Sequence, residues 1–148
     1  MRWRLWSRGF TVIDAEAGLR QEAFDCITMM NVLDRCDCPI TLLQSVRSAL
    51  KPSGVFVLAV VMPWCPFVER GTKKIPPREL LPMQGGECCK GATFEASTQR
   101  LVENVLTPLG FTLERWTKLP YLSQGSVDSE YYVLHDAVFL LRKTSAGP

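Results

Sequence analysis

Amide and carboxylate side chains follow an apolar stretch of the chain at short intervals. Asn31 comes directly after residues 24–30, Asp34 lies three positions further on, and Asp37 three positions beyond that. A carboxylate oxygen accepts a hydrogen bond from a ligand N–H group and can thereby hold that group in one tautomer. The same residues also suit a structural role, because Asp34 or Asp37 could cap a helix that begins near Pro39. Both interpretations stay open at this point.

Three tyrosines near the C-terminus are further candidates for a site. Tyr121, Tyr131 and Tyr132 could supply aromatic walls and hydroxyl donors to a pocket, and packing within strands is the equally weighted alternative. The single histidine, His135, falls within the last apolar segment, residues 131–141, and we interpret it as a partly buried structural residue. One histidine so placed offers no Ser-His-Asp or Cys-His pair, which disfavours nucleophilic hydrolysis.

The cysteines do not show the spacing of a metal or redox motif. None of the six forms a Cys-x-x-Cys pair, and only one histidine could add a nitrogen ligand. A site built from Cys36, Cys38, Cys88 and Cys89 is the less favoured alternative. We expect reduced thiols, several of them packed as small hydrophobic side chains, which suggests a reducing compartment.

The elements that must position these residues begin with a strand, a helix and a second strand. Residues 24–30 are the first of these strands, and the apolar repeat Leu42, Leu43, Val46 and Leu50 predicts a helix from Pro39 that stops in a turn at residues 51–54. Residues 55–62 show no polar alternation, which is typical of a central strand covered on both faces.

The remaining pattern completes a sheet. Trp3, Trp6 and Phe10 recur at helical spacing and predict helical turns at the start of the chain, followed by a short strand at residues 10–13. We further expect a long excursion over residues 69–93 with a short helix at 77–81, a helix over 97–109, and strands over 111–119 and 131–141. Because no helix joins the last two strands, we expect them to be antiparallel neighbours. The order is β, β, α, β, α, β, β.

This order predicts an α/β fold in which parallel strands end in an antiparallel pair, as in the C-terminal half of a doubly wound sheet. Ligands of such sheets bind beyond the carboxyl ends of the strands.

The 148 residues suffice for about one domain. A net charge of +2 without a block of five like charges gives no sign of a nucleic-acid partner. The longest apolar run, residues 55–63, is about half of the roughly 20 residues that a membrane-spanning helix needs, so we expect no membrane insertion.

Several long motifs closely resemble the DREV family of methyltransferases. The resemblance covers nearly the whole chain, is weakest between about residues 71 and 98, and rests on Phe24-Asp25-Cys26-Ile27, Asn31-Val32-Leu33-Asp34-Arg35-Cys36-Asp37, Pro39-Ile40-Thr41-Leu42-Leu43, Leu119-Pro120-Tyr121-Leu122, Tyr131-Tyr132-Val133-Leu134 and Asp136-Ala137-Val138-Phe139. It implies the class I, Rossmann-like fold, S-adenosylmethionine as cofactor, and methylation of the pros nitrogen of histidine in proteins that carry His-x-His motifs.

The resemblance also implies roles for individual residues. Asp34, Asn31 and Tyr132 would be catalytic, with Asp34 accepting from the distal ring N–H and Asn31 beside both cofactor and ring. Tyr121 and Tyr131 would bind the substrate. Cofactor contacts would come from Asp14, Ala15, Glu16 and Asn31.

The sequence also departs from the class I pattern. A glycine-rich turn after a first strand and an acidic residue after a second strand are absent, and His135 stands where we expect an acidic residue. We therefore expect residues 1–148 to form a partial methyltransferase domain that lacks the N-terminal cofactor-binding strands. A non-catalytic module that binds the substrate or another partner is the alternative function. An unpaired sheet edge would favour marginal stability or self-association. The family is associated with the endoplasmic reticulum and mitochondria.

Overall fold

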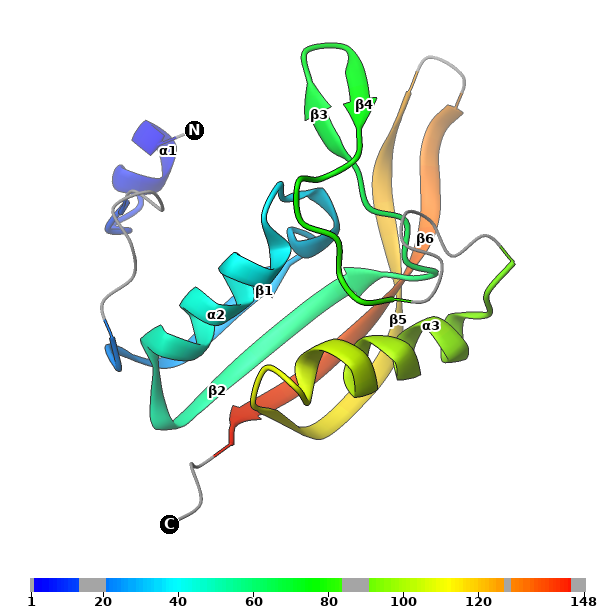
Figure 1. The fold of residues 1–148 in the computed structure, drawn as a ribbon. Helices are drawn as coiled ribbons and strands as arrows, with labels where there is room; N and C mark the ends of the chain where they lie inside the picture. The colour runs from blue at the N-terminus through cyan, green and yellow to red at the C-terminus, as the bar shows by residue number, and fades with distance from the viewer. Residues whose placement is uncertain (1, 14–20, 84–90, 127–128, 145–148) are drawn as a thin grey trace.

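The computed structural model describes residues 2–13, 21–83, 91–126 and 129–144. The elements run in the order α1 (Arg2–Trp6), β1 (Phe24–Met30), η2 (Leu33–Arg35), α2 (Pro39–Ala49), β2 (Leu50–Val61), β3 (Val68–Arg70), β4 (Lys73–Ile75), α3 (Phe94–Leu101), the π-helix η3 (Val102–Leu106), β5 (Phe111–Ser126) and β6 (Ser129–Lys143). Figure 1 shows α2 and α3 side by side in front of a twisted sheet.

The main sheet has four strands in the order β1-β2-β6-β5. β1 and β2 are parallel, whereas β6 is antiparallel to both of its neighbours. The parallel pair is joined through α2, and β5 and β6 follow each other without a helix. The predicted α/β sheet with a terminal antiparallel pair is thereby confirmed.

The connection from β1 to β2 follows from local chemistry. Pro39 occupies the first turn of α2, where its missing N–H costs nothing, and Glu79 accepts from the Thr41 amide at 2.9 Å. Neither Asp34 nor Asp37 is the N-cap, because Cys38 holds that position without a side-chain hydrogen bond. The buried positions Leu43, Val46 and Ala49 recur on one face of the helix.

The chain passes from α2 into β2 without the expected turn. Leu50 is already extended, with ψ at 131°, while its N–H still bonds to the Val46 carbonyl. Residues 51–54 therefore belong to β2, and their prediction as a turn is wrong. Pro52, Ser53 and Gly54, which suggested a turn, lie instead near the start of β2. Gly54 packs there against the Leu50 side chain, and an added Cβ would lie 2.8 Å from Leu50 Cγ.

The second helix begins earlier than expected. The Thr93 side chain accepts from the Ala96 amide at 3.2 Å, so α3 starts at Phe94 rather than at residue 97. The helix continues as η3 to Leu106. Gly110 then takes a φ of +79°, a left-handed conformation that favours glycine, before β5 begins.

Two short elements were predicted wrongly. Residues 10–13 form no strand, and residues 77–81 form no helix but an irregular segment in which the Arg78 amide donates to Asp37. Instead, residues 68–75 fold into the β3–β4 hairpin around Gly71. Four residues without a hydrogen-bonded neighbour cannot sustain a strand, and a proline pair removes two helix N–H donors.

The core lies on the helix side of the sheet. Phe56, Leu58 and Val60 on β2 are fully buried there, while Val57 and Val61 on the opposite face are only half-buried. β2 is central between β1 and β6, as predicted, but its expected coverage on both faces is wrong for the described residues. The helices that follow β1 and β2 in the chain both pack on the same face.

The β5–β6 pair extends past the rest of the sheet. Val61, the last residue of β2, pairs with Asp136, so residues 129–135 of β6 have only β5 beside them among the described strands. Figure 1 shows this projecting part next to the β3–β4 hairpin. We call residues 120–126 and 129–135 the ribbon.

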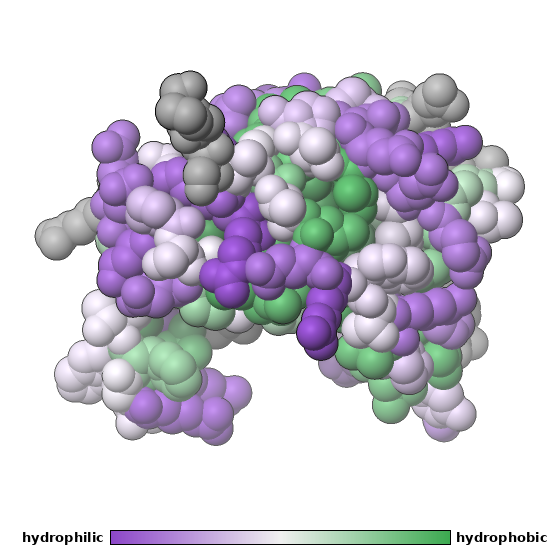
Figure 2. Space-filling view, turned by 90° about the horizontal axis from the view of Figure 1, so that it is seen from below, coloured by the Kyte–Doolittle hydropathy of each residue, from purple (hydrophilic) through white to green (hydrophobic). Residues whose placement is uncertain are grey.

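The N-terminal segment, residues 2–13, is set apart from the sheet and the helices that pack on it (Figure 1). Trp3 and Trp6 on α1 are 73% and 71% exposed, and the predicted helical turn there is confirmed. Figure 2 shows a hydrophobic patch on the lower left lobe, the side on which Figure 1 places α1.

Candidate functional site

The carboxyl end of β1 turns sharply at Asn31. Its φ of +53° is left-handed, a conformation that asparagine tolerates better than most residues, and its N–H still bonds to Ala59 on β2 at 2.9 Å. This turn ends the strand and directs the chain into η2. Asp34 is thereby placed at the edge of the sheet where the parallel strands end.

Asp34 is buried and held from several sides. Its side chain is 3% exposed, and its Oδ2 accepts from Arg35 Nη1 at 2.6 Å. The Asp34 carbonyl accepts from the Phe67 amide at 3.1 Å, and the Arg35 guanidinium lies 3.8 Å from the centre of the Phe67 ring. The second carboxylate oxygen, Oδ1, is buried without a hydrogen-bond partner.

A third polar residue, Asp136, joins this group from β6. It is 7% exposed and lies opposite Val61, at the carboxyl end of β2. Its Oδ2 accepts from Asn31 Nδ2 at 3.0 Å, a bond between residues 105 positions apart. Asp136 is not among the residues predicted from the sequence. The available signal was a carboxylate inside an otherwise apolar strand, beside His135, which is exposed rather than partly buried as predicted.

The three residues share an unusual property. Four buried side-chain nitrogen or oxygen atoms lack a hydrogen-bond partner in the described part of the chain; one is Trp64 Nε1. The other three are acceptors, and we call them the acceptor cluster: Asn31 Oδ1, Asp34 Oδ1 and Asp136 Oδ1. An unpaired buried polar group costs about 1–3 kcal/mol, so such atoms suit a ligand that brings N–H or O–H donors.

The electrostatics of the cluster favour a proton or a cation. Burial raises the pKa of Asp34, and this effect outweighs the opposing influence of the Arg35 guanidinium. The negative charge of Asp136 raises the pKa of Asp34 further, because the two carboxylates repel each other.

The predicted tyrosines lie on the ribbon and are exposed. Tyr121 pairs with Leu134, so Tyr121, Tyr132 and Asp136 project from the same face, since alternate residues of a strand share one side. Tyr132 is four residues from Asp136, about 13 Å along the strand. Tyr131 projects from the opposite face. The structure brings Asn31 and Asp34 together with Asp136 and places the tyrosines farther out.

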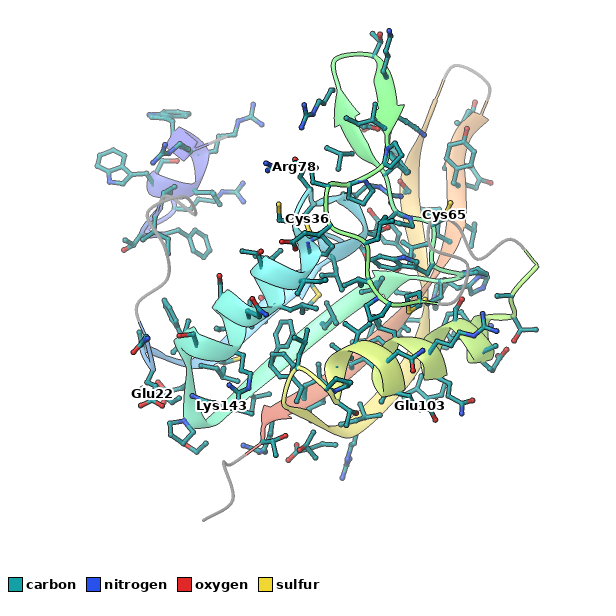
Figure 3. The ribbon with its side chains drawn as sticks, in the orientation of Figure 1. Glu22, Cys36, Cys65, Arg78, Glu103 and Lys143 are labelled. Atoms are coloured by element: carbon teal, nitrogen blue, oxygen red, sulfur yellow. The ribbon has the colours of Figure 1, made fainter. Side chains whose placement is uncertain are left out.

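Asp37 has a surface role. It accepts from the Arg78 backbone amide at 2.9 Å, from Arg78 Nε at 2.6 Å and from Arg70 Nη2 at 3.2 Å. The hydrogen bond from the Arg78 amide is the main reason that the pKa of Asp37 is lowered. These contacts tie the start of α2 to the segment after β4. Figure 3 shows Arg78 and Cys36 near the upper end of α2, and Glu22 with Lys143 at the opposite end of the molecule.

The cysteines differ from one another. Cys26, Cys36 and Cys38 are free thiols, and burial raises the pKa of Cys36 to about 11. Cys65 is disulfide-bonded, so the expectation of reduced thiols is wrong for this residue. Cys88 and Cys89 lie outside the described residues. Within the described ranges, no three His, Cys, Asp or Glu side chains are grouped to hold a metal ion.

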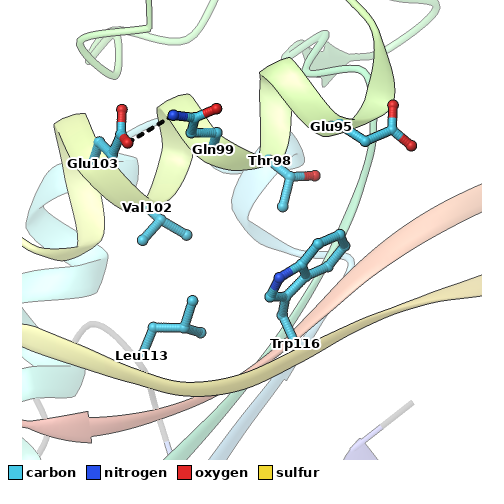
Figure 4. Close-up of a pocket in the computed structure, with 7 residues that line it drawn as sticks. All are labelled: Glu95, Thr98, Gln99, Val102, Glu103, Leu113 and Trp116. Atoms are coloured by element: carbon cyan, nitrogen blue, oxygen red, sulfur yellow. Dashed lines mark hydrogen bonds between the residues drawn. The ribbon is translucent and has the colours of Figure 1, made fainter.

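A separate groove lies between α3 and β5, away from the predicted site residues. It encloses about 290 Å³ and is lined by Glu95, Thr98, Gln99, Val102, Glu103, Leu113 and Trp116. Figure 4 shows the Gln99–Glu103 hydrogen bond on its rim. It contains none of the residues predicted to act on a substrate.

The predicted cofactor contacts can be tested only at Asn31, because Asp14, Ala15 and Glu16 lie outside the described residues. Asn31 fits the role in one respect. Its buried Oδ1 lacks a donor, and S-adenosylmethionine carries an ammonium group and hydroxyl groups that could supply one.

Comparisons with known proteins agree with this fold. The model of the DREV methyltransferase family matches residues 1–143. Among solved structures, 1,6-didemethyltoxoflavin-N1-methyltransferase of Burkholderia thailandensis with bound S-adenosylhomocysteine is similar, with a TM-score of 0.56 and 16% identity over 97% of this chain and 56% of that one.

Two further structures have the same fold. A structure described under the conversion of a disulfide bond into a thioacetal group during echinomycin biosynthesis gives a TM-score of 0.55 and 14% identity, covering 99% of this chain and 62% of the other. The PH0226 protein from Pyrococcus horikoshii OT3 gives 0.50 and 15%, covering 97% and 65%. The chain thus spans 56–65% of the length of these structures. In the part of the chain described, no helix has the length and apolar character to cross a membrane.

Proposed function

Because this chain belongs to the DREV methyltransferase family, we propose that it acts in methyl transfer from S-adenosylmethionine to the pros nitrogen of histidine in proteins with His-x-His motifs. The chain has the class I, Rossmann-like fold, and S-adenosylmethionine is the cofactor of this family and fold. The observation that carries the histidine substrate is the buried, unpartnered Oδ1 of Asp34.

Asp34 suits a neutral imidazole. Such a ring has one N–H and one nitrogen with a free lone pair. When Asp34 Oδ1 accepts from the distal N–H, the pros nitrogen is the unprotonated one. That nitrogen forms the new bond to carbon as the methyl–sulfur bond breaks, and the sulfur keeps the electron pair. The ring then carries positive charge, which the Asp34 carboxylate stabilises.

The other residues position the reactants. When bound, S-adenosylmethionine supplies a methyl group that is already activated, so orientation accounts for most of the catalysis. Asn31 would contact the cofactor through its Oδ1 and lie beside the ring. Tyr121 and Tyr132 share the Asp136 face of the ribbon and would enclose the substrate, with Tyr131 as a further contact.

Replacement of Asp34 tests this proposal. In Asp34→Ala, methylation of a synthetic His-x-His peptide should fall to background, while calorimetric titration with S-adenosylhomocysteine should give nearly the wild-type affinity. Asp25→Ala is the matched control, since Asp25 is an exposed carboxylate that pairs with Lys51. Full turnover by Asp34→Ala would remove Asp34 from the mechanism.

The geometry also supports a second candidate, a module that binds histidine-containing proteins without catalysis. All three atoms of the acceptor cluster belong to described residues, and none of them requires a methyl donor to hold a ring N–H. Titration of the 148-residue chain with S-adenosylhomocysteine separates the two functions. Micromolar binding would contradict the non-catalytic module, and no binding would contradict the enzyme.

A further inference from the structure

We infer that Asp136 is a positioning residue: it fixes the amide of Asn31 so that the acceptor cluster recognises its ligand through N–H donors. This inference rests on the proposed function and adds to it a residue that was not predicted from the sequence. Three observations carry it: the hydrogen bond between Asn31 and Asp136, the backbone of Asn31, and the charges around the cluster.

The hydrogen bond determines which way the amide points. A carboxylate can only accept, so the atom of Asn31 that lies 3.0 Å from Asp136 Oδ2 must be the NH₂ group. The reverse orientation would place two oxygens against each other. The Asn31 oxygen is therefore turned away from Asp136 Oδ2 and is left as an acceptor.

The backbone of Asn31 is fixed, so rotation of its side-chain amide is the main freedom that this residue keeps. The residue is anchored by its N–H bond to Ala59 and by a φ of +53° at the strand end. The terminal torsion of an asparagine is broad, so a partner must select one of its two amide orientations. Asp136 is that partner, and it is itself held in the β2–β6 ladder opposite Val61.

The charges favour a donor that is cationic or becomes so. Arg35 is 2.6 Å from Asp34 and offsets its charge, whereas no ion pair joins Asp136 in the described part of the chain. The cluster thus holds more negative than positive charge in a buried place. An imidazole ring that gains charge during methylation matches this field, and an anionic ligand does not.

Two methylated peptides test the inference without any need for catalysis. In a His-x-His peptide with N-pros-methylhistidine, the distal nitrogen carries a hydrogen when the ring is protonated, whereas the distal nitrogen of N-tele-methylhistidine carries the methyl group and never a hydrogen. Both carry one added methyl group. By calorimetry at about pH 5.5, below the ordinary histidine pKa of about 6.5, the wild-type chain should bind the pros-methyl peptide at least about tenfold more tightly, the effect of one charge-assisted hydrogen bond.

Variants at Asp136 separate positioning from mere structural support. Asp136→Leu has no acceptor, so the amide of Asn31 is free to turn its NH₂ toward the ligand, and the preference should fall although Asp34 can still accept. Asp136→Asn keeps a carbonyl that can accept from Asn31, so the preference should remain. The ratio of the two affinities is the readout, because a general loss of stability weakens the binding of both peptides equally.

The outcomes are distinct. A wild-type chain without the preference, a folded Asp136→Leu that retains it undiminished, or a folded Asp136→Asn that loses it would each overturn the inference. If Asp136→Leu does not fold, Asp136→Asn decides, together with the side-chain amide NMR signals of Asn31, which should stay those of a hydrogen-bonded NH₂. Failure of the proposed methyl transfer shows itself differently, as a preserved preference without turnover.

Discussion

Burial of Asp34 disfavours its charged form, and the stability of the fold therefore depends on pH. The raised pKa means that the folded chain binds a proton more tightly than the unfolded chain, whose carboxyl has the ordinary value of 3.8. The contribution to the free energy of unfolding is therefore fully present below pH 3.8 and is lost as pH rises through the folded pKa.

Asp34→Asn should remove this dependence. The free energy of unfolding of the variant, minus that of the wild type, should increase as pH rises from about 4 toward neutrality. Urea unfolding at a series of pH values measures it. Asp25→Asn, at an exposed position, should follow the wild-type curve. A difference that shrinks with rising pH would contradict the assignment of burial as the dominant effect.

Single residues differ in how far their roles could be predicted. Asn31 and Asp34 were selected because they directly follow an apolar strand, and position after a strand is readable from local sequence. Asp136 was missed because its partner, Asn31, is 105 positions away and only the sheet register brings them together. The roles of the tyrosines depend on where the ribbon ends, which the alternating pattern does not define.

At the scale of elements, Gly110 and Gly71 form a natural pair for a test of the α3–β5 connection. Both have positive φ, +79° and +63°, but an added Cβ would meet Arg47 Nε at 2.5 Å only at Gly110. Each substitution by alanine should cost about 1–2 kcal/mol for the left-handed backbone. Gly110→Ala should cost more, because it displaces the guanidinium that donates to the Gly110 carbonyl.

Chemical denaturation of both variants measures this difference. In an Arg47→Ala background the extra cost at Gly110 should disappear, since the clashing group is gone. An unchanged difference in that background would show that the Arg47 contact is not its cause.

The order of the β1–α2–β2 unit and the bounds of β1 and α2 were predicted correctly, because apolar periodicity and a proline at the helix start are local signals. The β3–β4 hairpin and the start of α3 were not. The hairpin has three residues in each strand, too few for a periodic signal. The α3 start depends on the Thr93 cap, which was overlooked although a threonine directly before an apolar residue, here Phe94, is a local signal of a helix start.

At the scale of the whole molecule, β1 is an edge of the described sheet. Its far side has no described neighbour, and Met30 and Val32 at its end are exposed. Open strand edges pair with other chains, so we expect concentration-dependent association. Thr28→Lys, which places a charge at an exposed edge position, should reduce it in sedimentation experiments.

The matched control is Gln44→Lys, which adds the same charge on an exposed position of α2. It should leave the association constant near that of the wild type. Equal effects of both lysines would point to net charge rather than to the strand edge.

The ribbon, finally, forms a two-stranded arm that can loosen on its own. Leu122 and Val133 pair near its tip with no third strand beside them in the described sheet, and a lone hairpin is only marginally stable in water. Amide hydrogen exchange should therefore quicken steadily from Asp136 toward the tip, while β2 stays protected up to global unfolding. Uniform protection along β6 would contradict this. Tyr121 and Tyr132 lie on the ribbon and would move with it as it opens. The rate at which the ribbon opens, and not unfolding of the core, would therefore determine how fast a ligand reaches the buried acceptor cluster.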